Sequence, residues 1–187
     1  MRIGVHYSIM RIVLGLALLF SLLANPIAVY AQAVSVDSCK KFVQDFYDWY
    51  ETYPKHVDYG NAYSFRPHSF SNTLASLLKQ DAAANAQGDG ISGLDADPFF
   101  ATNGGGDNDR FFVTSAHIRQ GHCFAGVHVV PEYPDIKGDI LTAELQAVKG
   151  QWQFVNLHYP ARGNLPEDDL ITNLKVLREE RIKPATK

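Results

Sequence analysis

The sequence lacks the features by which several protein classes are recognised. It has no run of basic residues, and 17 Lys and Arg against 20 Asp and Glu give a formal net charge of −3. Because phosphate recognition depends on clustered positive charge, nucleic acid is not an expected partner. The sequence also has no Gly-x-Ser-x-Gly elbow, no His-Glu-x-x-His pair and no glycine loop followed by Lys-Ser or Lys-Thr. These absences exclude the common serine-hydrolase, zinc-protease and phosphate-loop patterns.

The one long hydrophobic run is short for a membrane span, which needs about 20 apolar residues. It covers residues 12–23 and follows Arg2 and Arg11. The small-residue pattern Val-Tyr-Ala comes after it and ends at Ala31. A basic start, an apolar centre and a small-residue site are the three parts of a secretory signal. We therefore predict a signal peptide of residues 1–31, cleaved after Ala31 or alternatively after Ala33.

Two other interpretations of this N-terminus stay open. The run could be an uncleaved anchor, although Asn25 and Pro26 interrupt it where a span would continue. Cys39 could be the lipid-modified residue of a lipoprotein, although Asp37 stands where that signal needs a small residue. With cleavage, we expect no stable membrane span and a periplasmic or secreted protein.

The sequence has only two cysteines, and both lie beyond the predicted signal peptide. An even number of cysteines in a small exported chain favours a disulfide. We predict a bond between Cys39 and Cys123, with two separately buried thiols as the alternative. No linker, repeat or low-complexity block interrupts residues 32–187, so these form one predicted domain.

Three segments have the pattern of helices. Asp37 or Ser38 can cap the first, which contains a stripe of rings at spacings of three and four, and Pro54 ends it. The last has Pro166 at its first position and acidic residues in its first turn. The predicted helices cover residues 38–53, 71–86 and 166–181.

The rest of the domain alternates with the period of strands. Predicted strands cover residues 111–119, 122–130, 139–148 and 151–158. Because short turns such as Gln120-Gly121 and Lys149-Gly150 join them, they form an antiparallel meander. We expect an α+β fold, in which about four strands make a curved sheet with helices on one face, like a cone. Residues 86–110, rich in Gly, Asp and Asn, are predicted to be a surface loop.

Three segments carry a family resemblance, and together they span most of the predicted domain. They are Phe-Val-Gln-Asp-Phe-Tyr-Asp-Trp-Tyr at residues 42–50, Asp-Pro-Phe-Phe at 97–100 and Gly-Gln-Trp-Gln-Phe at 150–154. In this order they resemble a bacterial family called domain of unknown function 3828. The resemblance implies export and a fold like that of nuclear transport factor two, a cone whose open mouth binds ligands or proteins. Some members resemble immunity proteins, and related folds include isomerases and dehydratases.

Histidines in the predicted strands are the first candidates for chemistry. By alternation, His122, Phe124, Gly126, His128 and Val130 share one face of their strand. Trp152, Phe154, Asn156 and His158 should likewise share a face of the last strand. If His128 and His158 point into the cone with Glu144, they could serve as acid and base or hold a metal. Solvent-facing histidines are the alternative, and we assign no catalytic residue, metal or cofactor.

Aromatic and acidic residues supply the remaining candidates. Phe46, Trp49, Tyr50 and Trp152 could line a ligand pocket, or they could fill the core. The phenol of a buried tyrosine would then need a hydrogen-bond partner. Asp97 precedes a proline, which favours a turn in which its carboxylate accepts hydrogen bonds from nearby backbone amides.

The leading functional hypothesis is a non-catalytic binding module of the cell envelope. It would recognise an envelope protein or a small ligand through the mouth of the cone and the loop at residues 86–110. The alternative is an isomerase- or hydrolase-like enzyme with an acid/base pair in the cone cavity. A pocket with a buried acid or histidine would favour the enzyme, whereas a filled core would favour binding.

Overall fold

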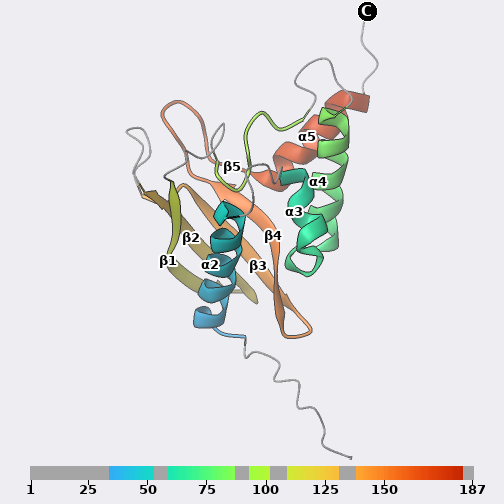
Figure 1. Cartoon of the computed structure of the whole chain (residues 1–187). Helices are drawn as coiled ribbons and strands as arrows, with labels where there is room; N and C mark the ends of the chain where they lie inside the picture. Colours follow the sequence, from blue (N-terminus) through green and yellow to red (C-terminus); the bar gives the residue numbers. More distant parts are fainter. Residues whose placement is uncertain (1–33, 53–58, 87–92, 102–108, 131–137, 183–187) are drawn as a thin grey trace, which may run out of the picture. The chain divides into compact units, whose positions relative to one another are not determined.

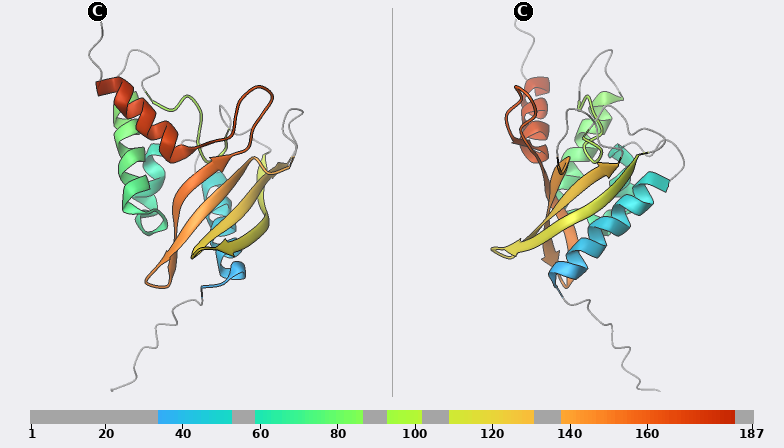
Figure 2. Two further views of the ribbon diagram at one scale, coloured as in Figure 1. Left: turned by 180° about the vertical axis from the view of Figure 1, so that it is seen from behind. Right: turned by 90° about the vertical axis from the view of Figure 1, so that its left-hand side faces the viewer.

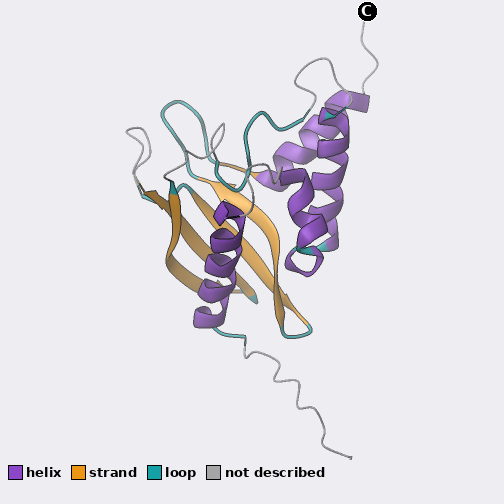
Figure 3. Ribbon diagram, viewed as in Figure 1, coloured by secondary structure: helices purple, strands orange, loops and turns teal. Residues whose placement is uncertain are grey.

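The computed structural model describes residues 34–52, 59–86, 93–101, 109–130 and 138–182. The predicted signal peptide, the alternative cleavage site at Ala33, and Tyr53 and Pro54 therefore lie outside the described residues. Within the described ranges, no helix is both long and apolar enough to cross a membrane. The domain is α+β, with a curved, open antiparallel sheet, and its helices form two groups (Figure 1, Figure 3).

Helix α2 (Val36–Thr52) lies across one face of the sheet and contacts strands β1 and β2 (Figure 1). Its first turn is closed by Ser35, not by the predicted Asp37 or Ser38. Ser35 and Ser38 each accept a hydrogen bond from the other's backbone N–H, at 3.1 and 3.0 Å. This reciprocal arrangement satisfies two donors that a helix start leaves free.

Three further helices pack against one another beside β4 (Figure 2). They are α3 (Tyr59–Phe65), α4 (Asn72–Asn85) and α5 (Leu170–Ile182), and a short 3-10 turn, η1 (Pro67–Ser69), follows α3. Helix α4 matches its prediction, and Ser71 caps it by accepting the N–H of Leu74 at 3.3 Å. Helix α3 is not among the three predicted helices, because seven residues are too few to show a helical period.

The start of α5 differs from the prediction of a helix beginning at Pro166. Asp168 and Asp169 form a two-residue strand, β5, which pairs with Tyr159 and His158. The helix then begins at Leu170, because the Asp169 carboxylate accepts the N–H of Thr172 at 3.0 Å and caps it.

The sheet is a meander in the order β1-β2-β3-β4-β5. Its four long strands lie close to their predicted limits, at Arg110–Arg119, His122–Val130, Leu141–Val148 and Gln151–Tyr159. The two predicted turns are confirmed: Gln120, Gly121, Lys149 and Gly150 all have φ between 52° and 81°. Such paired left-handed residues are typical of two-residue hairpin turns.

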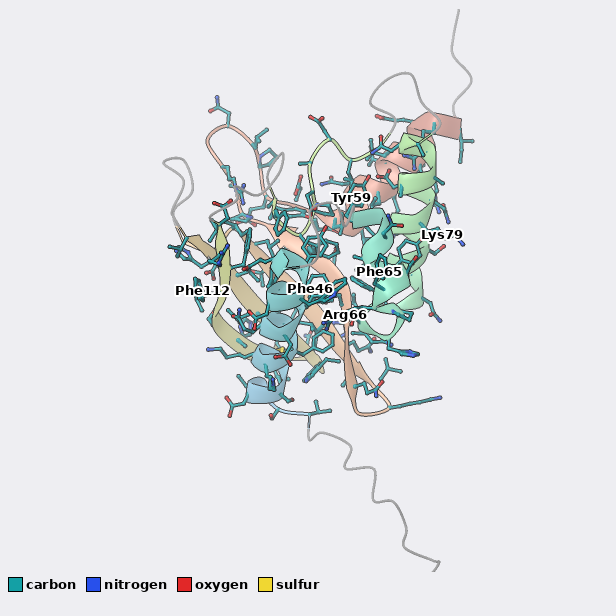
Figure 4. The ribbon with its side chains drawn as sticks, viewed as in Figure 1. Phe46, Tyr59, Phe65, Arg66, Lys79 and Phe112 are labelled. Atoms are coloured by element: carbon teal, nitrogen blue, oxygen red, sulfur yellow. A yellow bond between two sulfur atoms is a disulfide. The ribbon has the colours of Figure 1, made fainter. Side chains whose placement is uncertain are left out.

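The core lies between α2 and the sheet, and aromatic rings fill it (Figure 4). Phe46 is 1% exposed and contacts the rings of Phe70, Phe99 and Phe154 at centroid distances of 5.8, 5.0 and 4.9 Å. The predicted Cys39–Cys123 disulfide is present and joins α2 to β2 across 84 residues. Burial of rings and a covalent link therefore hold α2 on the sheet.

Candidate functional site

The histidine cluster lies on the face of the sheet opposite α2, not inside the fold as the acid/base hypothesis required. The Glu144 carboxylate is hydrogen-bonded to His158 Nε2 at 2.7 Å and to His122 Nδ1 at 2.6 Å. His128 is not part of the cluster, because its Nδ1 is 2.7 Å from the carbonyl oxygen of Gly138. The structure thus brings together two of the three predicted residues, with His122 in place of His128.

A bulge in β4 explains why the predicted face of His158 is wrong. Glu144 pairs with Asn156, but the next residue, Leu145, pairs with Phe154, so Val155 is an extra residue. An extra residue reverses the alternation beyond it. Trp152 and Phe154 are therefore buried with the core, whereas Asn156 and His158 point to the other face. The predicted shared face of β2 is confirmed, since Cys123, Ala125, Val127 and Val129 are all buried on the opposite side.

We call Glu144, His122 and His158, with the rings and cation beside them, the outer cluster. Its side chains contact one another through hydrogen bonds and ring stacking. Phe124 stacks on His117 at a centroid distance of 5.4 Å, and the Arg119 guanidinium lies 5.1 Å from the same ring. Within the part of the chain that the structure describes, no three His, Cys, Asp or Glu side chains are grouped to hold a metal ion. The cluster can orient imidazoles, because a carboxylate fixes which ring nitrogen carries the proton.

The four aromatic pocket candidates line neither of the two hollows described below. Phe46, Tyr50 and Trp152 are buried in the core, the second of the two roles that the sequence left open. Trp49 is half-buried, and the Arg66 guanidinium covers its ring at 4.5 Å. The Trp152 indole N–H donates to Ser38 Oγ at 2.9 Å, so this polar group is satisfied.

A hollow of about 450 Å³ lies where residues 94–101 meet the segment after β4 and the start of α5. Its lining is mainly apolar, with a few polar side chains among the apolar ones. The apolar residues are Leu94, Ala96, Pro98, Ala101, Tyr159, Pro160, Leu165, Pro166 and Leu170, and the polar ones are Asp95, Asp97, Arg162, Asp168 and Asn173.

A second hollow, of about 550 Å³, adjoins the first and shares Tyr159, Pro160 and Asp168 with it. Its other lining residues are Asp139, Thr142, His158, Glu167 and Asp169. We call the two hollows together the end groove. The groove includes His158, so the outer cluster and the groove meet at this residue.

The first wall of the end groove is the turn that Asp97 was predicted to form. Asp97 Oδ1 accepts the N–H groups of Phe99 and Phe100 at 2.8 and 3.3 Å. Its other oxygen, Oδ2, accepts the phenol of Tyr50 at 2.7 Å. The prediction for Asp97 is confirmed, and the same bond gives the buried Tyr50 phenol its partner.

Tyr159 and Arg162 fix the opposite wall. The Tyr159 phenol donates to the carbonyl oxygen of Pro98 at 3.0 Å, and burial raises the pKa of this phenol far above its usual value. Arg162 donates from Nη1 to the carbonyl oxygen of Ala101 at 3.1 Å and from Nη2 to that of Ile140. Burial lowers the pKa of this guanidinium. These bonds join the two walls of the groove through side-chain to backbone contacts.

The carboxylate of Asp139 lies directly over a glycine of the sheet. A Cβ at Gly126 would stand 2.0 Å from Asp139 Oδ2, so only glycine leaves room for this side chain. Thr114 donates to Asp139 Oδ1 at 2.7 Å and holds it there. Asp139 lines the second hollow, so the wall of this hollow depends on the glycine at position 126. The alternating pattern of a strand does not require a glycine there.

A buried network that the sequence did not reveal anchors Leu94 at the first hollow. Asp81, on α4, has no exposed surface, and its Oδ2 accepts the Tyr59 phenol and the N–H of Leu94, both at 2.9 Å. Its Oδ1 pairs with Arg181 Nη1 of α5 at 2.7 Å. The partners lie up to 100 residues apart in sequence, so local patterns carry no signal of this network.

Comparison with known proteins gave no match to any protein family, curated protein or solved structure.

Proposed function

We propose that this protein is an exported, non-catalytic binding module of the cell envelope that takes its partner in the end groove. The observation that carries the proposal is the first hollow, a mainly apolar recess of about 450 Å³ with a few fixed polar groups. Recesses of 300 to 1,000 Å³ with this kind of lining are typical binding sites. Its wall includes residues from the segment that the sequence predicted to be a recognition loop.

The filled core supports binding over catalysis inside the fold. The largest fully buried side chains include Tyr47, Phe46, Phe70, Phe99 and Phe154, which occupy the space that a cavity enzyme would leave for its substrate. The disulfide supports export, because such bonds persist in oxidising compartments. A periplasmic or secreted location, reached through the signal peptide of residues 1–31, belongs to this proposal.

The family resemblance is part of the same proposal. The curved antiparallel sheet with an aromatic helix across it is compatible with the cone of nuclear transport factor two and with domain of unknown function 3828. In that interpretation the end groove corresponds to the mouth of the cone. An immunity-like role, in which a toxin or another envelope protein is the partner, follows from the resemblance alone.

Site-specific photo-cross-linking tests whether the groove binds a partner in the envelope. Leu165 lines the first hollow and is 69% exposed, so a photoreactive phenylalanine can replace it without disturbing the core. Phe112, which is 49% exposed and lines neither hollow, is the matched control position. We expect specific adducts from position 165 and not from 112. Adducts from 112 alone, or equal adducts from both, would contradict the proposal.

Acid/base catalysis at His158 is the second candidate function. His158 lines the second hollow beside Thr142, and the Glu144 carboxylate holds its ring, as a carboxylate orients the base in many hydrolases. Purified protein should then hydrolyse p-nitrophenyl esters, and Glu144→Gln and His158→Gln should both abolish this activity. His128→Gln is the control, because His128 lies outside the cluster and should leave the rate unchanged.

A further inference from the structure

Among the described residues that line the end groove, negative charge far exceeds positive charge. Within these residues, six carboxylates line the two hollows, those of Asp95, Asp97, Asp139, Glu167, Asp168 and Asp169. The cationic side chain among the lining residues is Arg162, and the titratable imidazole is His158. An excess of one charge around an apolar recess attracts ligands of opposite charge and raises their rate of association.

Four of the groove carboxylates accept hydrogen bonds from neutral donors, which do not cancel a negative charge. Asp97 and Asp139 accept hydrogen bonds from a tyrosine, a threonine and backbone amides. Asp168 accepts the Asn173 amide at 3.1 Å. Burial opposes the charge on Asp169, but hydrogen bonds from Asn156 and Thr172 outweigh it and lower the pKa of this carboxyl.

Arg162 does not neutralise this charge by direct pairing. Both of its Nη groups donate to backbone carbonyl oxygens, and among the described residues it has no ion pair with a carboxylate. Glu167 and Asp168 are exposed and, in the same described ranges, also have no ion pair. Asp168, which lines both hollows, and Glu167, which lines the second, are therefore available to a cation from outside, although the charge of Arg162 also acts on Asp168.

The shape of the groove favours a protein segment over a free small molecule. Both hollows are open to solvent, whereas a small-molecule pocket usually buries most of its ligand. The hollows follow one another and share the wall at Tyr159 and Pro160. A chain that crosses both would place an apolar side chain in the first and a charged side chain against the carboxylates next to it.

We propose, on the basis of the binding function argued above, that the end groove recognises a partner protein through a segment in which lysine or arginine alternates with apolar residues. An apolar side chain occupies the recess at Leu94 and Leu165, and the basic group pairs with Glu167 and Asp168. Desolvated apolar contact supplies the affinity, and charge complementarity selects the sequence.

Synthetic peptides test this proposal by NMR titration of the ¹⁵N-labelled domain. The probes are blocked hexapeptides of alternating Leu-Lys, Leu-Glu, Leu-Ser and Ser-Lys, together with butylamine as a free cation. We expect only Leu-Lys to bind appreciably, with shifts in residues 94–101 and 159–169, and we expect its affinity to fall as salt is raised. Glu167→Gln with Asp168→Asn should weaken this binding by about two- to fivefold per charge, as expected for exposed ion pairs.

Asp45→Asn is the matched control, since Asp45 is an exposed carboxylate on α2 that lines neither hollow. If Asp45→Asn weakens Leu-Lys as much as the groove variants, or if Leu-Glu or Leu-Ser binds equally well, selection of a basic segment is wrong. If butylamine reproduces the shifts and competes, a protein segment is the wrong source of the cation. After either of these outcomes, NMR shifts at the residues of the end groove would still support the proposed binding function. If no peptide shifts these residues and position 165 gives no cross-linked adducts, both the binding function and the selection of a basic segment are contradicted.

Discussion

Glu51, in the last turn of α2, is an ionisable residue whose charge opposes folding. Burial raises the pKa of its carboxyl, although the N–H of Phe111, which donates to Oε1 at 2.7 Å, and the nearby Arg110 act in the other direction. A negative charge at a helix C-terminus is also unfavourable to the helix dipole. Because the folded-state pKa is raised, the associated stability is present below the unfolded-state pKa and is lost as pH rises through the folded-state value.

Glu51→Gln should therefore make the protein more stable at pH 7. The amide oxygen can still accept the N–H of Phe111, and the variant has no charge to desolvate. Urea denaturation between about pH 4 and pH 8 should show a higher free energy of unfolding at neutral pH and a flatter pH dependence than in the parent protein. A less stable variant at pH 7 would mean that attraction to Arg110 outweighs burial.

At the scale of elements, α2 protects the outer edge of β1. Gln44 accepts the N–H of Val113 at 2.9 Å and donates to the carbonyl oxygen of Phe111 at 3.0 Å, so one side chain replaces a neighbouring strand. Glu51 and Lys40 bind two further backbone groups of the same edge. Uncovered edges are sites of unwanted strand pairing, and this stripe of polar side chains prevents it at this part of β1.

Gln44→Ala should expose this edge and lower the free energy of unfolding by about 1 to 3 kcal/mol, because two partly buried backbone groups lose their partners. Asp45→Ala, an exposed change on the neighbouring position of α2, should alter stability by less than about 0.5 kcal/mol. Chemical denaturation gives both values. Equal effects from the two variants would show that helix propensity, and not edge protection, determines the result.

Helix α5 depends on the cap at Asp169. Asp169→Ala removes hydrogen bonds to Asn156 and Thr172 and should lower the free energy of unfolding by about 1 kcal/mol at pH 7. Because the pKa of Asp169 is lowered in the folded protein, this stability is present above the unfolded-state pKa and is lost as pH falls through the folded-state value. The difference from the parent protein should thus shrink in acid. A difference that stays constant down to about pH 2 would contradict this role.

At the scale of the whole molecule, the disulfide between Cys39 and Cys123 closes a long loop of the chain. Its 84-residue separation predicts a loss of about 4 to 5 kcal/mol on removal in the chain-entropy picture. We expect Cys39→Ala with Cys123→Ala to have a clearly lower midpoint in guanidinium, and the parent protein to reach the same midpoint after reduction. If the double variant and the unreduced parent protein have the same midpoint, packing of α2 alone holds the fold.

The architecture of this domain can be predicted well from the sequence, because regular patterns of apolar and turn residues mark most of its helices and strands. Alternation and Gly-containing turns located the four long strands, and the spacing of rings located α2. Helix α3 was missed because it is short, whereas two other errors come from single residues whose effect depends on distant partners. Val155 reversed the face of His158, and the pairing of Asp168 with Tyr159 moved the start of α5.

The candidate site was harder to predict than the fold. Asp97 could be identified as a turn residue, because its bonds are to its neighbours in sequence. The end groove combines this turn with residues near 139, 160 and 170, which only the sheet topology brings together. The charge of the groove is likewise a property of the folded arrangement, since it brings together acids from three separate parts of the chain: Asp95 and Asp97, Asp139, and the run Glu167-Asp168-Asp169.

The pairing of Asp81 with Arg181 links completion of the fold to its final helix. Until the end of α5 docks, a carboxylate in the middle of the helical layer has no cationic partner, and desolvating it alone is strongly unfavourable. Since the same carboxylate accepts the N–H of Leu94, loss of Arg181 would weaken a contact that fixes the wall of the first hollow. The shape of the end groove thus depends on a residue of α5 that does not line it.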